Sequence, residues 1–300
     1  MADIDIRRDV SLKPYTTMRC GGPAAFFAEP ESADQVGEAF EFARRESLPV
    51  VLLGAGSNVL ISDKGFDGLV IRIGKPMSRI DCKISDGSGV IDCEAGAMLA
   101  SFGVTCVNNG LEGAEFCCGI PGAVGGAVFM NAGAYGRQMA DIVKEVTYWQ
   151  DGDIRKISGD EADFGYRKSI FTGMEDTVIL GMKAEVPEGD ITKIKEYADE
   201  LRQKRINSQP LNHPSCGSTF KRPEGYFAGR LIEDAGLKGF SLDDSGARVS
   251  EKHAGFVVNV GGVASATDVY RLIRYVQDKV FSTSGVRLEL EVKLIGDFDL

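Results

Sequence analysis

Gly119-Ile-Pro-Gly-Ala-Val-Gly-Gly-Ala-Val-Phe-Met-Asn-Ala-Gly133 is the most informative stretch for the fold, with five glycines, one proline and no charged residue. Glycine and proline are the two weakest helix formers, so we expect no ordinary helix here. Glycine also lets a ligand approach the main chain closely. The composition therefore predicts a loop packed against a flat or phosphorylated ligand. A bulged loop that binds nothing is the alternative.

A second glycine-rich segment, Gly54-Ala-Gly-Ser-Asn58, follows a predicted buried strand at 49–53. It resembles half of a dinucleotide fingerprint, but Val59 stands where GxGxxG requires a small residue, so a Rossmann fold is a poor match. Its amides and polar side chains suit a pyrophosphate, although a tight turn explains the motif as well. The predicted cofactor-binding residues are Gly54, Ala55, Gly56, Ser57, Asn58, Gly119, Ile120, Pro121, Gly122, Gly125, Gly126 and Asn131.

The composition is that of an ordinary globular protein: 300 residues, 43% hydrophobic and 26% charged. A net charge of −10 disfavours nucleic acids and membrane surfaces as partners, because phosphates are repelled by an acidic surface. The N-terminal segment carries charges throughout and lacks the apolar core of a signal peptide. No window approaches the ~18 apolar residues of a membrane span. We therefore expect a cytoplasmic protein without a membrane partner.

The seven cysteines are an odd set without zinc-ligand spacing, so we expect free thiols in a reducing compartment. Only two histidines are present, His213 and His253. This excludes a histidine-rich metal site, and no metal is expected.

Hydrophobic periodicity predicts an α+β chain. Helices are expected after the N-cap Ser32, at 97–108, after Asp190 and at 267–280. Strands are expected at 49–53, 68–73, 89–94, 178–182 and 287–295, with a hairpin turn at Asp151-Gly152. The stretch 207–214 contains two prolines and no periodicity, which places a domain boundary near 205–212.

Three further motifs are candidates for chemistry. Arg167 stands in Tyr166-Arg-Lys-Ser169, and arginine suits bidentate binding of a carboxylate. Ser218 stands in Gly217-Ser-Thr-Phe220 without the GxSxG of hydrolases, so proton donation fits better than acyl transfer. Glu291 shares a predicted strand face with Glu289 and Lys293. A solvated turn, a turn serine and a solvated edge strand are the plain alternatives.

Eight segments together resemble the UDP-N-acetylenolpyruvoylglucosamine reductase family. In order they are YTTMRCGGPA (15–24), GAGSNVLISDKGFDGLVI (54–71), GIPGAVGGAVFMNAGAYG (119–136), YRKSIF (166–171), GSTFKRP (217–223), AGRLIEDAGLKG (228–239), HAGFVVN (253–259) and LELEVKLIG (288–296). The absence of a long insertion after YRKSIF resembles the shorter, second type of this enzyme. The resemblance implies an FAD-binding fold of the vanillyl-alcohol-oxidase/p-cresol-methylhydroxylase type in two subdomains, 1–75 and 76–205. A C-terminal α+β substrate domain, 206–300, follows.

The resemblance also implies a function in peptidoglycan synthesis. The enzyme would hold FAD noncovalently and use NADPH as co-substrate to reduce UDP-N-acetylglucosamine-enolpyruvate to UDP-N-acetylmuramate. By resemblance, Ser218 protonates C2, while Arg167 and Glu291 polarise the carboxylate and stabilise the developing charge. The predicted substrate-binding residues are Tyr166, Lys221, Arg222, Arg230, Arg248 and Lys252. No obligatory protein partner is expected.

The chain departs from the family pattern at two informative places. Ser208 stands where a basic residue is frequent, so a diphosphate contact is missing or is replaced by Arg202, Lys204 or Arg205. Cys216 stands where alanine is frequent. It is either a small buried hydrophobe or, lying two residues before Ser218, a thiol that faces the cleft.

Two other functions compete with the reductase. A flavin-dependent oxidase often holds FAD covalently through histidine, and the N-terminal half has no histidine. A non-catalytic flavin- or nucleotide-sugar-binding module would be expected to lack Arg167, Ser218 or Glu291, and all three are present.

Overall fold

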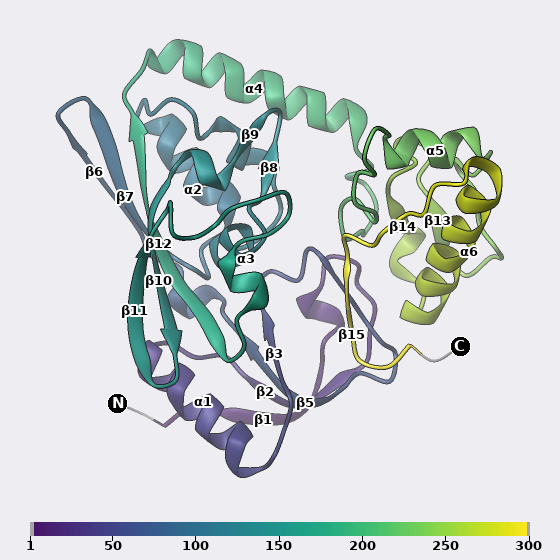
Figure 1. Ribbon diagram of the computed structural model, residues 1–300, viewed down its shortest axis with the longest axis horizontal. Coiled ribbons are helices and arrows are strands. Elements are labelled where there is room, and N and C mark those ends of the chain that lie inside the picture. Colours follow the sequence, from purple (N-terminus) through teal and green to yellow (C-terminus); the bar gives the residue numbers. More distant parts are fainter. Residues whose placement is uncertain (1–2, 299–300) are drawn as a thin grey trace. The chain divides into compact units, whose positions relative to one another are not determined.

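The computed structural model describes residues 3–298. Its contacts divide the chain into two compact units. The first consists of Met1–Arg7, Phe27–Ala55 and Leu69–Arg205, and the second of Arg8–Phe26, Gly56–Gly68 and Ile206–Leu300. Figure 1 shows the helices and strands of both units. The predicted α+β class is confirmed, whereas the three-part division at 75 and 205 stays a prediction.

A four-stranded sheet is built from the N-terminal quarter of the chain. Its order is β1 (Ile6–Ser11), β2 (Pro23–Ala28), β5 (Phe66–Arg72) and β3 (Val50–Leu53), and β3 runs parallel to β5. Helix α1 (Ala33–Arg45) precedes β3 and begins as predicted, because Ser32 Oγ accepts a hydrogen bond from Gln35 N. The predicted apolar face of α1 is buried. On this face Phe40 stacks on Trp149 with ring centroids 4.7 Å apart.

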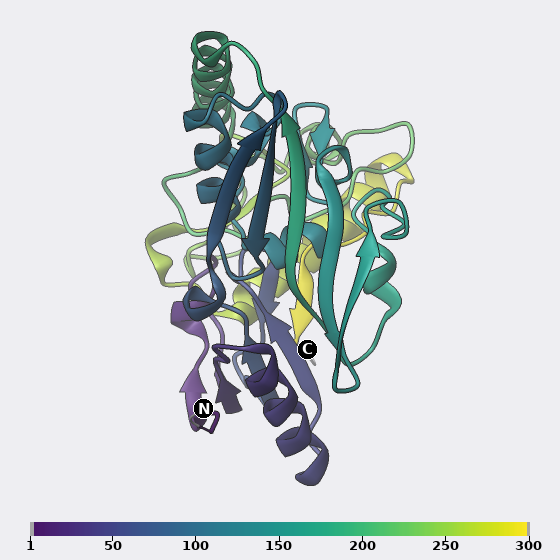
Figure 2. The ribbon, with the colours of Figure 1, turned by 90° about the vertical axis from the view of Figure 1, so that its left-hand side faces the viewer.

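An antiparallel five-stranded sheet lies in the first unit (Figure 2). Its order is β11 (Asp153–Ser158), β10 (Val143–Gln150), β12 (Thr177–Pro187), β7 (Ser88–Glu94) and β6 (Ile80–Ser85). The predicted hairpin turn joins β10 to β11, and both of its residues have positive φ, 50° at Asp151 and 91° at Gly152. This is the conformation that matches the twist of paired strands, which explains the glycine.

Helices α2 (Leu99–Asn108) and α3 (Val124–Phe129) lie in the first unit with the short 3₁₀ helix η3 (Glu115–Gly119). The expectation that residues 119–133 contain no helix is wrong, because α3 forms inside this stretch. Packing overrides propensity here: a Cβ on Gly125 would lie 2.9 Å from the Cβ of Ala95, so only glycine allows this approach. The small hairpin β8 (Gly133–Ala134) and β9 (Arg137–Gln138) follows α3.

The second unit is held together by α5 (Ala228–Asp234) and α6 (Ala266–Ser284), which pack on each other. Helix α6 also packs on the strand pair β13 (Ala247–Val249) and β14 (Val257–Asn259), and a parallel pair joins β15 (Lys293–Ile295) to β4 (Val59–Ile61). The predicted stripe of α6 is fully buried, and Gly285 ends the helix with a φ of 73°. The unit therefore unites segments from three parts of the sequence around one core.

Two predicted elements differ from the structure. The strand expected at 287–295 is reduced to β15, with an isolated bridge between Phe220 and Leu290. Leu288 and Val292 are buried while Glu289 is exposed. The alternation of apolar and polar residues in the sequence therefore reflects burial and not continuous pairing with a neighbouring strand. Helix α4 (Ile191–Ser208) is capped by Asp190 as predicted, but only Ile194 and Leu201 of its apolar stripe are buried.

All seven cysteines are free thiols, as expected. Within residues 3–298, no helix is both long enough and apolar enough to cross a membrane.

Candidate active site

The two glycine-rich segments meet within the first unit. A Cβ placed on Gly54, at the end of β3, would lie 3.3 Å from the Cβ of Ala123, at the start of α3. Leu99 N donates to Gly122 O at 2.9 Å and Val124 N donates to Ala97 O at 2.8 Å. These two bonds attach the second glycine-rich segment to residues 97–99. The structure therefore brings Gly54 and the Gly119–Gly126 run together, as one cofactor would require.

The last three residues of the first glycine segment, Gly56–Asn58, belong to the second unit. Gly56 has a φ of +63°, and a Cβ at this position would collide with the carbonyl oxygen of Tyr15. The oxygen of Gly56 accepts a hydrogen bond from Thr17 N at 3.0 Å. The close approach of residues 15–17 thus requires glycine at 56. This glycine is therefore explained by packing within the protein rather than by an open space for a ligand.

Asn58 connects this segment to Glu291, which lies two residues before β15. Its Nδ2 donates to Glu291 O at 3.1 Å, and its own carbonyl oxygen accepts from Lys293 N at 2.9 Å. The parallel pairing of β4 with β15 begins one residue later, at Val59 and Lys293. We predicted Asn58 as a cofactor ligand, and the structure shows that its side chain also holds the backbone of Glu291.

Ser218 and Glu291 lie on neighbouring segments of the second unit. Glu291 N donates to the carbonyl oxygen of Thr219 at 2.9 Å, so the residue after Ser218 is bonded directly to Glu291. Both catalytic candidates are half-buried, while Thr219 is 2% exposed. The structure therefore brings together two of the three predicted catalytic residues.

Thr219 is a supporting residue that the sequence did not reveal. Its N donates to Gly255 O at 2.9 Å, and its Oγ1 accepts from Val257 N at 3.0 Å. Together with its bond to Glu291, these contacts hold the Ser218 turn against the segment after His253. The only sequence signal for Thr219 was its position next to Ser218 in Gly217-Ser-Thr-Phe220. A threonine beside a candidate serine is too common to indicate a supporting role.

Arg167, the third catalytic candidate, lies in the first unit at the tip of a tight turn. Gly165 N donates to Lys168 O at 3.0 Å, and Arg167 adopts a left-handed backbone with a φ of 56°. Its guanidinium carbon lies 5.4 Å from the centroid of the Tyr166 ring, which is itself 57% exposed. A left-handed arginine is strained, and such strain is frequent at functional sites.

Asn131 anchors this turn to the glycine-rich stretch. It is 1% exposed, and its Nδ2 donates to Gly165 O and to Gln138 Oε1, both at 3.0 Å. Its Oδ1 accepts from Ala140 N at 3.0 Å. Ser169 Oγ adds a bond to Phe129 O at 2.7 Å. These contacts give Asn131 an internal role that joins the predicted cofactor segment to the Arg167 turn.

The predicted diphosphate-binding cations of the second unit all have partners within the protein. Lys221 pairs with Glu289 at 3.2 Å and Arg230 with Asp234 at 2.9 Å. Exposed pairs of this kind contribute little to stability, so a ligand can replace the carboxylate at small cost. Those with other partners are Arg222, bonded to Tyr226 O at 3.2 Å, Arg248, bonded to Ser241 Oγ at 3.2 Å, and Lys252, bonded to Ile206 O.

Cys216 is a buried thiol. It is 4% exposed, and its Sγ contacts Val59 O at 3.0 Å. Burial raises the pKa of this thiol, with the neighbouring Cys20 acting in the same direction. These contacts support the small buried hydrophobe rather than a thiol in the cleft.

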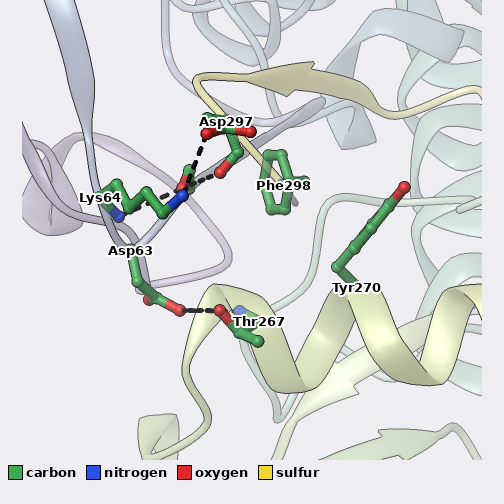
Figure 3. Close-up of a pocket in the computed structure, with 7 residues that line it drawn as sticks. Asp63, Lys64, Thr267, Tyr270, Asp297 and Phe298 are labelled. Atoms are coloured by element: carbon green, nitrogen blue, oxygen red, sulfur yellow. Dashed lines mark hydrogen bonds and ion pairs between the residues drawn. The ribbon is translucent and has the colours of Figure 1, made fainter. Parts of the chain in front are cut away.

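A pocket of the second unit lies away from every predicted site residue. Its lining residues are Ser62, Asp63, Lys64, Thr267, Tyr270, Asp297 and Phe298 (Figure 3). Asp63 accepts hydrogen bonds from Ala266 N at 2.9 Å and Thr267 N at 2.8 Å, and Lys64 pairs with Asp297 at 3.0 Å. The pocket is therefore a junction between the start of α6 and two loops. The described residues contain no cluster of three or more potential metal ligands.

Two family profiles match successive parts of the chain. One family profile, the FAD binding domain, matches residues 24–158. Another, the C-terminal domain of UDP-N-acetylenolpyruvoylglucosamine reductase, matches residues 209–295. The UDP-N-acetylenolpyruvoylglucosamine reductase of Agathobacter rectalis is 45% identical, covering 99% of this chain and 96% of the relative. The chain belongs to the UDP-N-acetylenolpyruvoylglucosamine reductase family.

Other members of the family are similarly close. The Clostridioides difficile reductase is 43% identical, covering 98% of this chain and 94% of the relative. The crystal structure of the Thermus caldophilus reductase superposes with a TM-score of 0.81 at 34% identity, covering 98% of this chain and 100% of that one. The predicted family, FAD-binding fold, cofactor and oxidoreductase class are thus confirmed. The roles of individual residues stay predictions.

Proposed function

We propose that this chain reduces UDP-N-acetylglucosamine-enolpyruvate to UDP-N-acetylmuramate, with NADPH as the source of electrons. The observation that supports the assignment of roles is the direct backbone bond between Thr219, the residue after Ser218, and Glu291, at 2.9 Å. Noncovalently bound FAD would supply hydride transfer, from NADPH and then to C3 of the enolpyruvyl group. Its binding residues would be Gly54–Asn58 and the Gly119–Asn131 segment.

Ser218 would supply the proton that completes the reduction. Hydride addition at C3 leaves a carbanion at C2, and the hydroxyl of Ser218 donates its proton there. A serine hydroxyl is a weak acid, so it can act only on a strongly basic acceptor such as this carbanion. Its half-buried position suits this role, because a fixed donor in partial shelter from water needs little reorganisation.

Arg167 and Glu291 would stabilise the charge that develops during this step. Arginine binds a carboxylate through two parallel hydrogen bonds, and the substrate carboxylate gains negative charge as C2 becomes a carbanion. The left-handed backbone of Arg167 costs about 1–2 kcal/mol, which is easier to explain by function than by folding. Glu291 would fix the orientation of the enolpyruvyl group from a backbone held at two points, by Asn58 and Thr219.

The UDP portion would be bound by cations of the C-terminal segment. A chain with net charge −10 requires local positive charge to hold a diphosphate, and Lys221, Arg222, Arg230, Arg248 and Lys252 provide it. Tyr166 would contact the substrate from the Arg167 turn. The enzyme would act in the cytoplasm on this nucleotide sugar. Neither a nucleic acid nor an obligatory protein partner is required.

The test separates the two half-reactions by stopped flow. Ser218→Ala should leave flavin reduction by NADPH unchanged and slow reoxidation by the UDP-sugar about 10²–10⁴-fold, because the proton is needed only in the second step. Ser282→Ala, at an exposed site near the end of α6, is the matched control. Equal slowing of both half-reactions would rule out the role of Ser218. If the protein takes up FAD but the UDP-sugar never reoxidises the bound flavin, the proposed function is ruled out.

A further inference from the structure

Thr17 lies in the N-terminal segment of the second unit and contacts the loop that carries Ser218. Its Oγ1 donates to the carbonyl oxygen of Ser215 at 2.6 Å, although the two residues are 198 positions apart in the sequence. Oγ1 of Thr17 also lies 3.4 Å from Gly56 O. A hydroxyl has one proton, and the shorter contact to Ser215 is the better hydrogen bond. Thr17 is thus bonded to the backbone three residues before the candidate proton donor.

The backbone on the two sides of Ser218 is attached differently. On the C-terminal side, Thr219 is held by its own backbone and by its buried hydroxyl. On the N-terminal side, Gly217 has a φ of +75°, and a Cβ there would meet no atom within 4 Å. Packing therefore does not fix the turn at Gly217, and the position of Ser218 depends on how the residues before it are held. The hydroxyl of Thr17 holds one of them, at the carbonyl of Ser215.

Thr17 is itself fixed to the first glycine-rich segment. Its backbone N donates to Gly56 O at 3.0 Å, and residues 15–17 lie directly against this glycine. Threonine is also stiff about χ1, so a fixed backbone sets the direction of its hydroxyl. The residue therefore connects two segments through separate groups, its amide to Gly56 and its hydroxyl to the Ser218 loop.

Other contacts keep the Ser218 loop folded when the Thr17 hydroxyl is absent. They are made by backbone groups or by a thiol, and none involves Thr17. They are the bridge between Ser215 and Val258, the bond from Asn259 N to Pro214 O at 2.9 Å, and the contact of Cys216 Sγ with Val59 O at 3.0 Å. Loss of the hydroxyl should therefore shift the Ser215 carbonyl without unfolding the loop.

We propose that Thr17 is a positioning residue for the proton-donating step, and that it holds the Ser218 loop in place relative to the first glycine-rich segment. Its hydroxyl acts by fixing the carbonyl of Ser215 and takes no part in proton transfer. The inference rests on the proposed function, because it concerns the support of Ser218 in that reaction. The neighbouring Thr16 has no such connection: its hydroxyl bonds only within its own turn, to Lys13 O at 3.5 Å and Cys20 O at 3.4 Å.

Stopped-flow measurement of both half-reactions in the full-length, FAD-loaded protein tests this role. Thr17→Val removes the hydroxyl and keeps the branched shape of the side chain. It should leave flavin reduction by NADPH unchanged and slow reoxidation by the UDP-sugar about 2–12-fold, the loss of one net hydrogen bond. The solvent deuterium isotope effect on reoxidation should rise, because a displaced donor makes proton transfer more rate-limiting. Thr16→Val, the matched control, should change neither half-reaction.

Two further variants separate positioning from a purely structural role. Thr17→Ser keeps the hydroxyl, so its reoxidation should stay within about 2-fold of the wild-type rate. In a Ser218→Ala background, Thr17→Val should have no further effect, because the group that Thr17 positions is already gone. Effects that multiply in the double variant would overturn the proposal. If Thr17→Val does not fold, Thr17→Ser decides: a wild-type rate supports the proposal, and reoxidation slowed more than about 2-fold overturns it.

The remaining outcomes distinguish this role from the proposed function. FAD affinity, measured by equilibrium dialysis without turnover, should be equal in the wild type and in Thr17→Val. A loss of FAD affinity, or equal slowing of both half-reactions, would show that Thr17 supports the cofactor segment and would overturn the positioning of Ser218. If the wild type turns over and Thr17→Val reoxidises at the same rate, only the positioning role fails. A wild type that the UDP-sugar never reoxidises would overturn both.

Discussion

Asn58→Ala tests whether the first glycine-rich segment positions a catalytic residue as well as the cofactor. The substitution removes the hydrogen bond from Nδ2 to Glu291 O, which is 3.1 Å long. It leaves the backbone bond from Lys293 N to Asn58 O in place, so the pairing of β4 with β15 should persist. The perturbation is therefore confined to one of the two attachments of Glu291.

The expected magnitude follows from the burial of this contact. Asn58 and Glu291 are both half-buried, so water can reach the carbonyl that loses its donor. The loss is then that of a net hydrogen bond, about 0.5–1.5 kcal/mol, rather than the larger penalty of a buried unsatisfied group. If this cost falls on the transition state, reoxidation of the flavin by the UDP-sugar slows about 2–12-fold.

Stopped-flow measurement of both half-reactions provides the assay, with bound FAD and melting temperature measured in parallel. Asn109→Ala is the matched control, because Asn109 Nδ2 also donates to a backbone carbonyl, Thr105 O at 2.8 Å, at the exposed end of α2. Flavin reduction by NADPH should be unchanged in both variants. A variant that loses FAD but reoxidises normally at saturation would show that Asn58 is a cofactor ligand and would refute the positioning role.

Three further expectations concern the second unit and its stability. Gly56→Ala should lower the unfolding free energy by about 2–4 kcal/mol in a denaturant titration, because alanine would adopt a left-handed backbone and its Cβ would collide with Tyr15 O. Gly87→Ala is the control: its φ is +79° and the space around it is open, so it should show only the cost of the left-handed backbone. Burial raises the pKa of Asp63, but hydrogen bonds from the start of α6 outweigh it and hold that pKa below its usual value. The stability from Asp63 is therefore present above its unfolded pKa of about 3.9 and lost as pH falls through the folded value, so Asp63→Asn should flatten the acid side of the stability profile and cost about 1 kcal/mol at pH 7. Cys216 should resist alkylation in the native protein while the half-buried Cys82 and Cys118 react first, which peptide mass spectrometry would contradict if Cys216 were labelled at their rate.

Local patterns in the sequence were sufficient where a single element decides its own structure. Helix α6 was predicted because its apolar residues recur on one face, and the structure adds a capping box of Ser265 and Asp268 at its start. The β10–β11 hairpin was predicted because Asp151-Gly152 supplies both positive φ angles. In each case the determining residues are neighbours in the chain.

Patterns failed where a partner distant in the sequence decides the structure. Helix α3 forms despite its glycines because Gly125 packs against Ala95, and no residue near 125 in the sequence predicts that contact. The segment 287–292 alternates like a strand, yet it forms no continuous ladder. Its backbone has one bridge, at Phe220, and separate bonds to Thr219, Lys221, Asn58 and Gln277. Asn58 and Glu291 are 233 residues apart, so their hydrogen bond has no local signature. The cations of the C-terminal segment could be named from sequence, but not their carboxylate and carbonyl partners.

The pentapeptide Gly54–Asn58 shows why cofactor binding and catalysis are linked in this chain. Its first residue lies against Ala123 and the second glycine-rich segment, whereas its last residue holds the backbone of Glu291. The division into two units falls between Ala55 and Gly56, inside this motif. Each end is fixed by contacts within its own unit, so the covalent chain of five residues connects the predicted cofactor segment to the segment that carries Glu291. Substitutions at the two ends should therefore separate into effects on FAD affinity at Gly54 and on flavin reoxidation at Asn58.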